Sequence, residues 1–249
     1  MTQNKLLKIA AIVTALFLWQ AAALILNQKV LFVGPIEVLQ AFIVQLISAS
    51  FWATVWFSLW RVFFGFVLAF LAGIALAALS HMFLSFRVML WPYISVIKST
   101  PVASVIILIL IFLNSRSLSI IISFLIVMPV VYANILEGLA NTDKKLLEMA
   151  EVYDVGLIKR IKYIYLPQLH PYIISTCTAS IGMAWKSGSA AEVIGIPKGS
   201  IGERLYQAKI YLNTSELFAW TAIIILLSMI VEKITLWVIN SFYRALWRS

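Results

Sequence analysis

The sequence NTDKKLLEMAEVYDVGLIKRIKYIYLP, residues 141–167, is the longest polar stretch between the apolar runs of this chain. Its pattern predicts two short helices separated by a break. Thr142 or Asp143 is expected to cap the first helix and Asp154 the second, since an oxygen side chain accepts hydrogen bonds from the free amides of a first turn. Pro167 and Pro171 are expected to break the chain after the second helix.

The second predicted helix is amphipathic. Lys159, Arg160 and Lys162 lie away from an apolar stripe at helical spacing, which consists of Leu157, Ile158, Ile161, Ile164 and Tyr165. Such a stripe has two interpretations in a membrane protein. It covers the protein's own base or lies on lipid headgroups, or it docks onto a partner domain. Periodicity alone does not separate them.

The composition around this segment is that of a membrane protein. The chain has 249 residues, of which 63% are hydrophobic and 12% charged, with a mean hydropathy of +0.99. Soluble domains are about half apolar and about a quarter charged. The net charge of +9 arises mostly from residues between apolar runs, so it indicates membrane topology rather than nucleic-acid binding.

The apolar runs predict an all-α membrane protein with about six transmembrane helices in a single domain, residues 1–249, because a span needs about 20 mainly apolar residues. The spans are expected at about 6–26, 55–79, 90–113, 118–139, 172–189 and 217–242, with the polar segment, about 141–168, between the fourth and fifth. Prolines 92, 101 and 129 predict kinks. Small residues recur every fourth position in the second span and favour close helix packing, namely Gly65, Ala69, Gly73 and Ala77.

The distribution of Lys and Arg predicts the orientation. With six spans and a cytoplasmic N-terminus, ten basic residues fall inside: Lys5, Lys8, Arg87, Lys144, Lys145, Lys159, Arg160, Lys162, Arg244 and Arg248. Five fall outside: Lys29, Arg116, Lys198, Arg204 and Lys209. Both termini and the polar segment are therefore expected to be cytoplasmic.

The polar segment resembles the EAA loop of the binding-protein-dependent permeases of ABC importers. That pattern has Glu-Ala-Ala, three residues, Gly, nine residues and Ile-x-Leu-Pro. Here Glu148-Met149-Ala150 and Ile164-Tyr165-Leu166-Pro167 take the two ends at the full spacing, and Asp154 stands where the family has glycine. Asp tolerates turn conformations, so the break is expected to survive.

A second stretch narrows the resemblance to the nitrate, sulfonate and taurine type. It comprises Trp185-Lys186 and Ala190-Ala191-Glu192-Val193-Ile194-Gly195. The resemblance implies a type I importer permease in a prokaryotic cell membrane. It also implies the partners: a second permease subunit, two cytoplasmic ATPase subunits that hold ATP and Mg, and an external binding protein. Sulfonates, nitrate and vitamin precursors remain open as substrates.

The resemblance further implies that the loop couples transport to the ATPase. The residues expected to do so are Glu148, Ala150, Asp154, Leu157, Ile161, Ile164, Leu166 and Pro167. The chain has no Gly-x-x-x-x-Gly-Lys-Ser/Thr motif, so no ATPase activity and no cofactor of its own are expected.

Charges within spans are costly and often functional. We expect Lys98, Trp185, Lys186 and Glu192 to line the substrate pathway, although packing explains each of them about as well. A stand-alone secondary transporter is the alternative, but it would need a coupling-ion site or a repeat. A membrane enzyme would need a metal cluster or a nucleophile with a base, which the lone Cys177 and the separate His81 and His170 do not offer.

Overall fold

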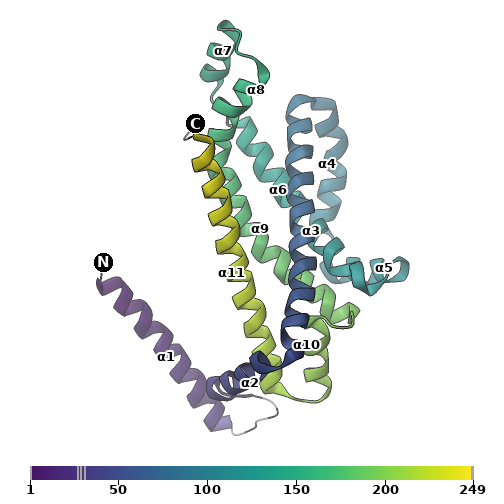
Figure 1. Ribbon diagram of the computed structural model, residues 1–249. Helices are drawn as coiled ribbons and strands as arrows, with labels where there is room; N and C mark the ends of the chain where they lie inside the picture. Colours follow the sequence, from purple (N-terminus) through teal and green to yellow (C-terminus); the bar gives the residue numbers. More distant parts are fainter. Residues whose placement is uncertain (1, 27, 29, 31, 248–249) are drawn as a thin grey trace.

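The computed structural model describes residues 2–26, 28, 30 and 32–247, and over these residues the chain is helical (Figure 1). The elements are α1 (Thr2–Leu26), α2 (Pro35–Ile47), α3 (Ala49–Met82), α4 (Leu84–Ser99), α5 (Val102–Phe112), α6 (Ser115–Ala140), α7 (Lys144–Val152), α8 (Leu157–Arg160), a π-helical turn (Ile161–Tyr165), α9 (Leu166–Gly195), α10 (Ile201–Ile210) and α11 (Thr214–Trp247).

Helices α3, α6 and α9 form the centre of the bundle. Their main apolar cluster includes Val62, Val131 and Trp185, all at most 2% exposed. Glycine allows the close approach: a Cβ at Gly65 would lie 2.5 Å from the carbonyl oxygen of Ile120, and one at Gly188 would lie 2.7 Å from the Val62 side chain. The close packing predicted for the small-residue stripe of α3 is therefore confirmed.

Within the part of the chain that the structure describes, four helices are long and apolar enough to cross a membrane: α1, α3, α6 and α11. The bent pair α4–α5 makes a fifth if it counts as one span. Helix α9, which contains the predicted span 172–189, has 30 residues but does not meet the same test of composition. Its Ser, Thr, Lys and Glu residues lower its hydropathy. The all-helical membrane fold is thus confirmed, with four or five spans identified by length and composition.

The predicted third span, 90–113, is broken at Pro101, one of the two prolines expected to interrupt it. Helices α4 and α5 meet at a bend of 103°. Pro101 is the N-cap of α5, and Thr100 before it is extended, with a ψ of 131°. The residue before a proline avoids the helical region, which explains why the break lies here. Pro92 is accommodated inside α4 and Pro129 inside α6.

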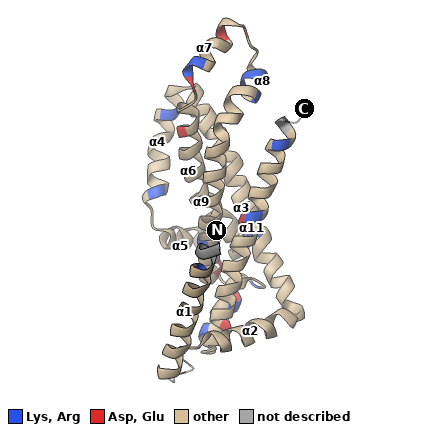
Figure 2. Cartoon of the chain, turned by 90° about the vertical axis from the view of Figure 1, so that its left-hand side faces the viewer, with Lys and Arg blue, Asp and Glu red and all other residues tan. Residues whose placement is uncertain are grey.

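The loop helices and the end of α11 lie at one end of the bundle, and α2 and α10 at the other (Figure 1). Helix α1 diverges from the bundle and is held at its far end, where Trp19 Nε1 donates to the Val33 carbonyl at 3.0 Å and the Trp19 ring packs on Phe218. Charged residues of both signs gather on α7 and α8, while long parts of the bundle helices carry none (Figure 2).

Candidate functional site

Helix α7 is capped and tied to the bundle at its start. Asp143 is its N-cap, and its carboxylate accepts from the amide of Lys145 at 2.9 Å. The amide of Asp143 donates to Oε1 of Gln168 in α9 at 2.8 Å. Of the two caps that the sequence allowed, Asp143 is the one used. Thr142 is buried and donates to the carbonyl of Gly138 instead.

The break after α7 is a Schellman motif with Asp154 in the left-handed conformation. Its φ is 48°. The amide of Val155 donates to the Ala150 carbonyl at 2.8 Å, and that of Asp154 donates to Glu151 at 3.1 Å. This is the position where helices most often place glycine. The expected break is confirmed, but the prediction that Asp154 caps the second helix is wrong, because Gly156 is the N-cap of α8.

Arg160 closes the same bend, a role that the sequence reasoning missed. Its Nε donates to the Val155 carbonyl at 2.6 Å and its Nη2 to the Ala150 carbonyl at 3.2 Å. A guanidinium presents several N–H groups in a fixed plane, so it can join two carbonyls that point to one side. The signal available in the sequence was a basic residue close after a helix end, where free carbonyls favour cations.

The second helix of the loop continues into α9 without a break, which corrects the prediction for Pro167 and Pro171. The amide of Leu166 donates to the carbonyl of Ile161, five residues earlier, in a π-helical turn. Pro167 then occupies the first turn of α9 and Pro171 lies within that helix. The π-helical turn directly before Pro167 already departs from regular α-helical pairing, so both prolines are accommodated in one continuous helical path.

Much of the loop's apolar surface is uncovered. Leu157 is 65% exposed and Ile158 is 82% exposed, whereas Ile164 is 8% exposed and packs inward. The predicted stripe is therefore divided between a buried and an open part. On α7, Ala150 is buried, while Met149 and Val152 are open. Glu148, Leu157 and Arg160 line a hollow of about 380 Å³ between the two helices.

The loop stands clear of the bundle. Helices α7 and α8 extend beyond the ends of α4 and α11 (Figure 1). The uncovered residues of the loop thus have no cover from the rest of the described chain. We call this set the loop patch, and it consists of Met149, Val152, Tyr153, Leu157, Ile158 and Ile161.

The four predicted pathway residues do not converge on one surface. Lys98 is exposed at the end of α4, next to the α4–α5 bend, and Lys186 is exposed on α9. Trp185 is 2% exposed and belongs to the main core, and Glu192 is 1% exposed. Their role in a pathway stays a prediction.

The Glu192 carboxylate joins three helices. Ser58 of α3 donates to its Oε2 at 2.6 Å, and the amide of Ile201, at the start of α10, donates to the Ser58 hydroxyl at 2.9 Å. The amide of Gly202 lies 3.4 Å from the same carboxylate oxygen. A negative group is favoured at a helix N-terminus. Among the described residues, no group of His, Cys, Asp and Glu could hold a metal ion.

Residues 65–248 match the family model described as binding-protein-dependent transport system inner membrane component. The chain is 25% identical over 202 residues to a probable ABC transporter permease protein of Brucella melitensis, covering 81% of this chain and 82% of that protein. It is also 25% identical over 217 residues to a putative aliphatic sulfonates transport permease protein of Bacillus subtilis, covering 86% of this chain and 75% of that protein.

These findings confirm the resemblance seen in the loop. A permease component of this kind is a multi-pass inner membrane protein, is not itself the ATPase, and implies ATPase and binding-protein partners. The chain belongs to the family of binding-protein-dependent transport system inner membrane components, the permeases of ABC transporters.

Proposed function

We propose that this chain forms the solute pathway of an importer and that residues 141–168 dock onto a separate ATPase subunit. The observation that carries this proposal is the loop patch, an apolar surface displayed on two helices that stand clear of the bundle. Helices with an exposed apolar face commonly dock into a partner's groove. The fixed bend at Asp154 and the two hydrogen bonds of Arg160 support a loop that acts as one rigid piece.

The mechanism follows from how the loop is attached. The second loop helix runs through the π turn into α9 without interruption, so a push on the loop reaches the centre of the bundle directly. ATP binding to the partner would favour one arrangement of the loop and hydrolysis the other. A ligand that prefers one of two states shifts the population between them.

A second copy of the chain completes the pathway in this proposal. One face of α9 is open and bears polar side chains, including Ser175, Thr178 and Lys186. Such a face is unfavourable against lipid tails. A second permease subunit or a water-filled pathway would cover this face of α9. In the same proposal, the loop and both chain termini lie on the cytoplasmic side of the membrane.

We propose a small organic or inorganic anion as the substrate, with an aliphatic sulfonate first and nitrate or an anionic vitamin precursor next. The relative in Bacillus subtilis is described as a putative aliphatic sulfonates transport permease. Lys98 and Lys186 are exposed cations that would suit an anion. The choice between sulfonate and nitrate is tested by uptake of radiolabelled sulfonate into cells that express the complete transporter. Uptake is measured with and without excess nitrate.

Co-purification tests docking. Ile158→Ser removes the most exposed apolar side chain of α8, and Lys159→Ser is the matched control on the neighbouring polar position. We expect the ATPase subunit to co-purify with the wild type and with Lys159→Ser, and to be largely lost from Ile158→Ser. Equal recovery in all three would contradict docking through the loop patch. No ATPase with any of them would favour the secondary transporter.

A further inference from the structure

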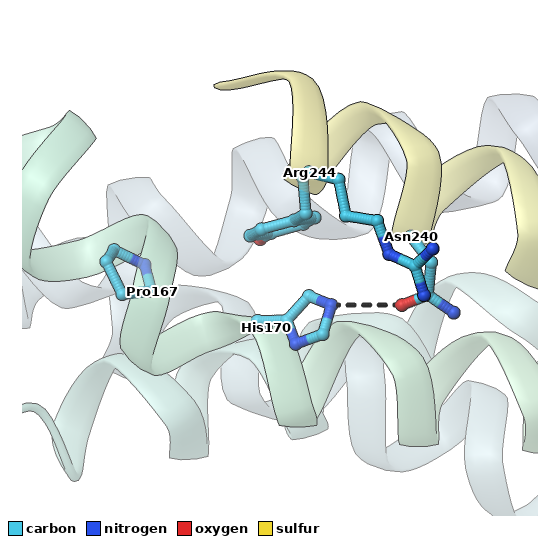
Figure 3. A pocket seen from close by; sticks show the side chains of 5 residues that line it. Pro167, His170, Asn240 and Arg244 are labelled. Atoms are coloured by element: carbon cyan, nitrogen blue, oxygen red, sulfur yellow. Dashed lines mark hydrogen bonds between the residues drawn. The ribbon is translucent and has the colours of Figure 1, made fainter. Parts of the chain in front are cut away.

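A polar pocket of about 480 Å³ lies between the start of α9 and the end of α11, apart from the loop patch and from the predicted pathway residues. It is lined by Pro167, His170, Asn240, Tyr243 and Arg244 (Figure 3). One of the five residues is a permanent cation and none is acidic. The pocket therefore has the charge of an anion site rather than of a cation site.

The donors of the pocket are held in a fixed arrangement. Nε2 of His170 lies 3.2 Å from Oδ1 of Asn240, and the two side chains point toward one another (Figure 3). An amide oxygen only accepts, so the imidazole donates here and the NH₂ group of Asn240 stays available as a donor. Arg244 follows Asn240 by four residues on α11, which places both side chains on one face of the helix.

The position of the pocket identifies the source of the anion. Helix α11 has 34 residues and ends at Trp247, whereas about 20 residues suffice to cross the hydrocarbon core. Asn240 and Arg244 lie in its last turns, which we therefore expect to reach the headgroup region. Guanidinium groups bind phosphate through paired hydrogen bonds. Basic pockets between membrane helices bind the headgroups of anionic lipids.

We propose that this pocket binds the phosphate of an anionic lipid, with Arg244 and Asn240 as donors and His170 as the residue that orients Asn240. Binding requires only that α11 crosses the membrane. It therefore stands independently of docking to an ATPase and of the identity of the transported solute.

The occupied pocket has a direct connection to the loop. The Tyr243 ring packs on His170 with centroids 4.2 Å apart, and its hydroxyl donates to the Leu166 carbonyl at 3.1 Å. Leu166 is the residue whose amide closes the π turn to Ile161. A headgroup that orders His170 and Arg244 would thus also order the junction of the loop with α9.

Lipid titration of the delipidated full-length chain in neutral detergent tests the proposal, with bound lipid counted by native mass spectrometry. Phosphatidylglycerol carries a net negative charge, whereas phosphatidylcholine carries the same phosphodiester without one. We expect phosphatidylglycerol to bind at least about fivefold more tightly, since one basic residue near a membrane surface contributes a factor of that order. Inorganic phosphate at millimolar concentration is expected not to compete.

Arg244→Gln is expected to remove most of this preference. The matched control is Lys233→Gln, which removes an exposed cation of the same helix outside the pocket. Equal binding of the two lipids, or an equal effect of the two substitutions, would overturn the proposal. Competition by inorganic phosphate would assign the pocket to a soluble phosphate compound and would also overturn it.

Tyr243→Phe separates lipid binding in the pocket from the effect of the bound lipid on the junction between the loop and α9. It keeps the ring beside His170 and removes the donor to Leu166. We expect Tyr243→Phe still to bind phosphatidylglycerol in preference to phosphatidylcholine, because the donors Arg244 and Asn240 remain. In the wild type, the lipid should slow amide exchange at residues 161–166, and in Tyr243→Phe this slowing should be lost. Slowing of the same size in both proteins would contradict the connection through Tyr243.

Discussion

Asp154 occupies a backbone position that costs most residues free energy. A left-handed conformation is disfavoured by about 1–2 kcal/mol for an ordinary L-residue, and Asn and Asp are among the few that visit it routinely. The φ of 48° at Asp154 therefore explains how the chain keeps the family's bend without the family's glycine. The carboxylate itself is exposed, so the backbone conformation is the property that matters here.

Two substitutions at Asp154 separate conformation from charge. Asp154→Gly and Asp154→Val both remove the carboxylate, but only valine is strained at this φ. We expect Asp154→Gly to keep ATP-driven uptake, with stability within about 1 kcal/mol of wild type, since relief of strain opposes the greater freedom of the unfolded chain. Asp154→Val is expected to destabilise the bend by about 1–2 kcal/mol. Amide exchange of residues 150–156 measures this, and equal exchange in the two variants would contradict it.

Arg160 is expected to be irreplaceable by lysine. Its two hydrogen bonds hold the carbonyls of Val155 and Ala150 together, and an ammonium group does not present the same planar pair of donors. Arg160→Lys should cost about 1.5–3 kcal/mol of local stability, the range for a hydrogen bond to a charged group. The measurement is amide exchange at Val155, with Lys159→Gln as control. Retained protection in Arg160→Lys would show that charge alone suffices.

At the scale of elements, α10 depends on a very close approach to α9. A Cβ at Gly202 would lie 2.3 Å from the backbone carbonyl carbon of Glu192, and backbone cannot move aside as a side chain does. The hydrogen bonds among Ser58, Glu192 and the start of α10 would be displaced with it. Gly202 is therefore the position at which α10 is most sensitive to added volume.

Gly202→Ala is expected to lower stability by about 1–3 kcal/mol, the usual cost of overpacking. The matched control is Gly182→Ala in α9, where an added Cβ would meet nothing within 4 Å in the chain. Alanine is the better helix former, so this control should be neutral or stabilising by up to about 1 kcal/mol. Thermal unfolding of the purified chain in detergent compares them. Equal melting temperatures would argue against the close α9–α10 contact.

The sequence predicted some elements well and others poorly, for physical reasons. Capping by Asp143 and the close packing of Gly65 follow from local chemistry and periodicity, so they could be foreseen. The hydrogen bonds of the Glu192 carboxylate could not be predicted, because they depend on Ser58, which is 134 positions away in the sequence. The sequence also could not show which residues of the apolar stripe in the loop are buried and which are exposed. A pattern of apolar residues does not reveal which of them the chain itself covers.

At the scale of the whole molecule, the orientation in the membrane is a prediction that single cysteines can test. Cys177 is 1% exposed, so a membrane-impermeant maleimide should leave it unreacted in the folded protein. Lys159→Cys on α8 and Lys209→Cys on α10 place an exposed thiol at opposite ends of the bundle. In intact cells Lys209→Cys should be labelled and Lys159→Cys protected until the membrane is permeabilised. The reverse pattern would overturn the orientation and with it the access of an ATPase to the loop.

We propose that the loop passes the energy of ATP to the bundle. The most direct measurement is solute uptake into proteoliposomes that contain the complete transporter with wild-type permease or with Glu148→Arg. Glu148 lines the hollow between the loop helices and lies outside the bundle core. We predict loss of uptake in Glu148→Arg, with the assembled protein present in normal amount and with an unchanged melting temperature. Uptake at the wild-type rate in this variant would rule out a coupling role for the loop.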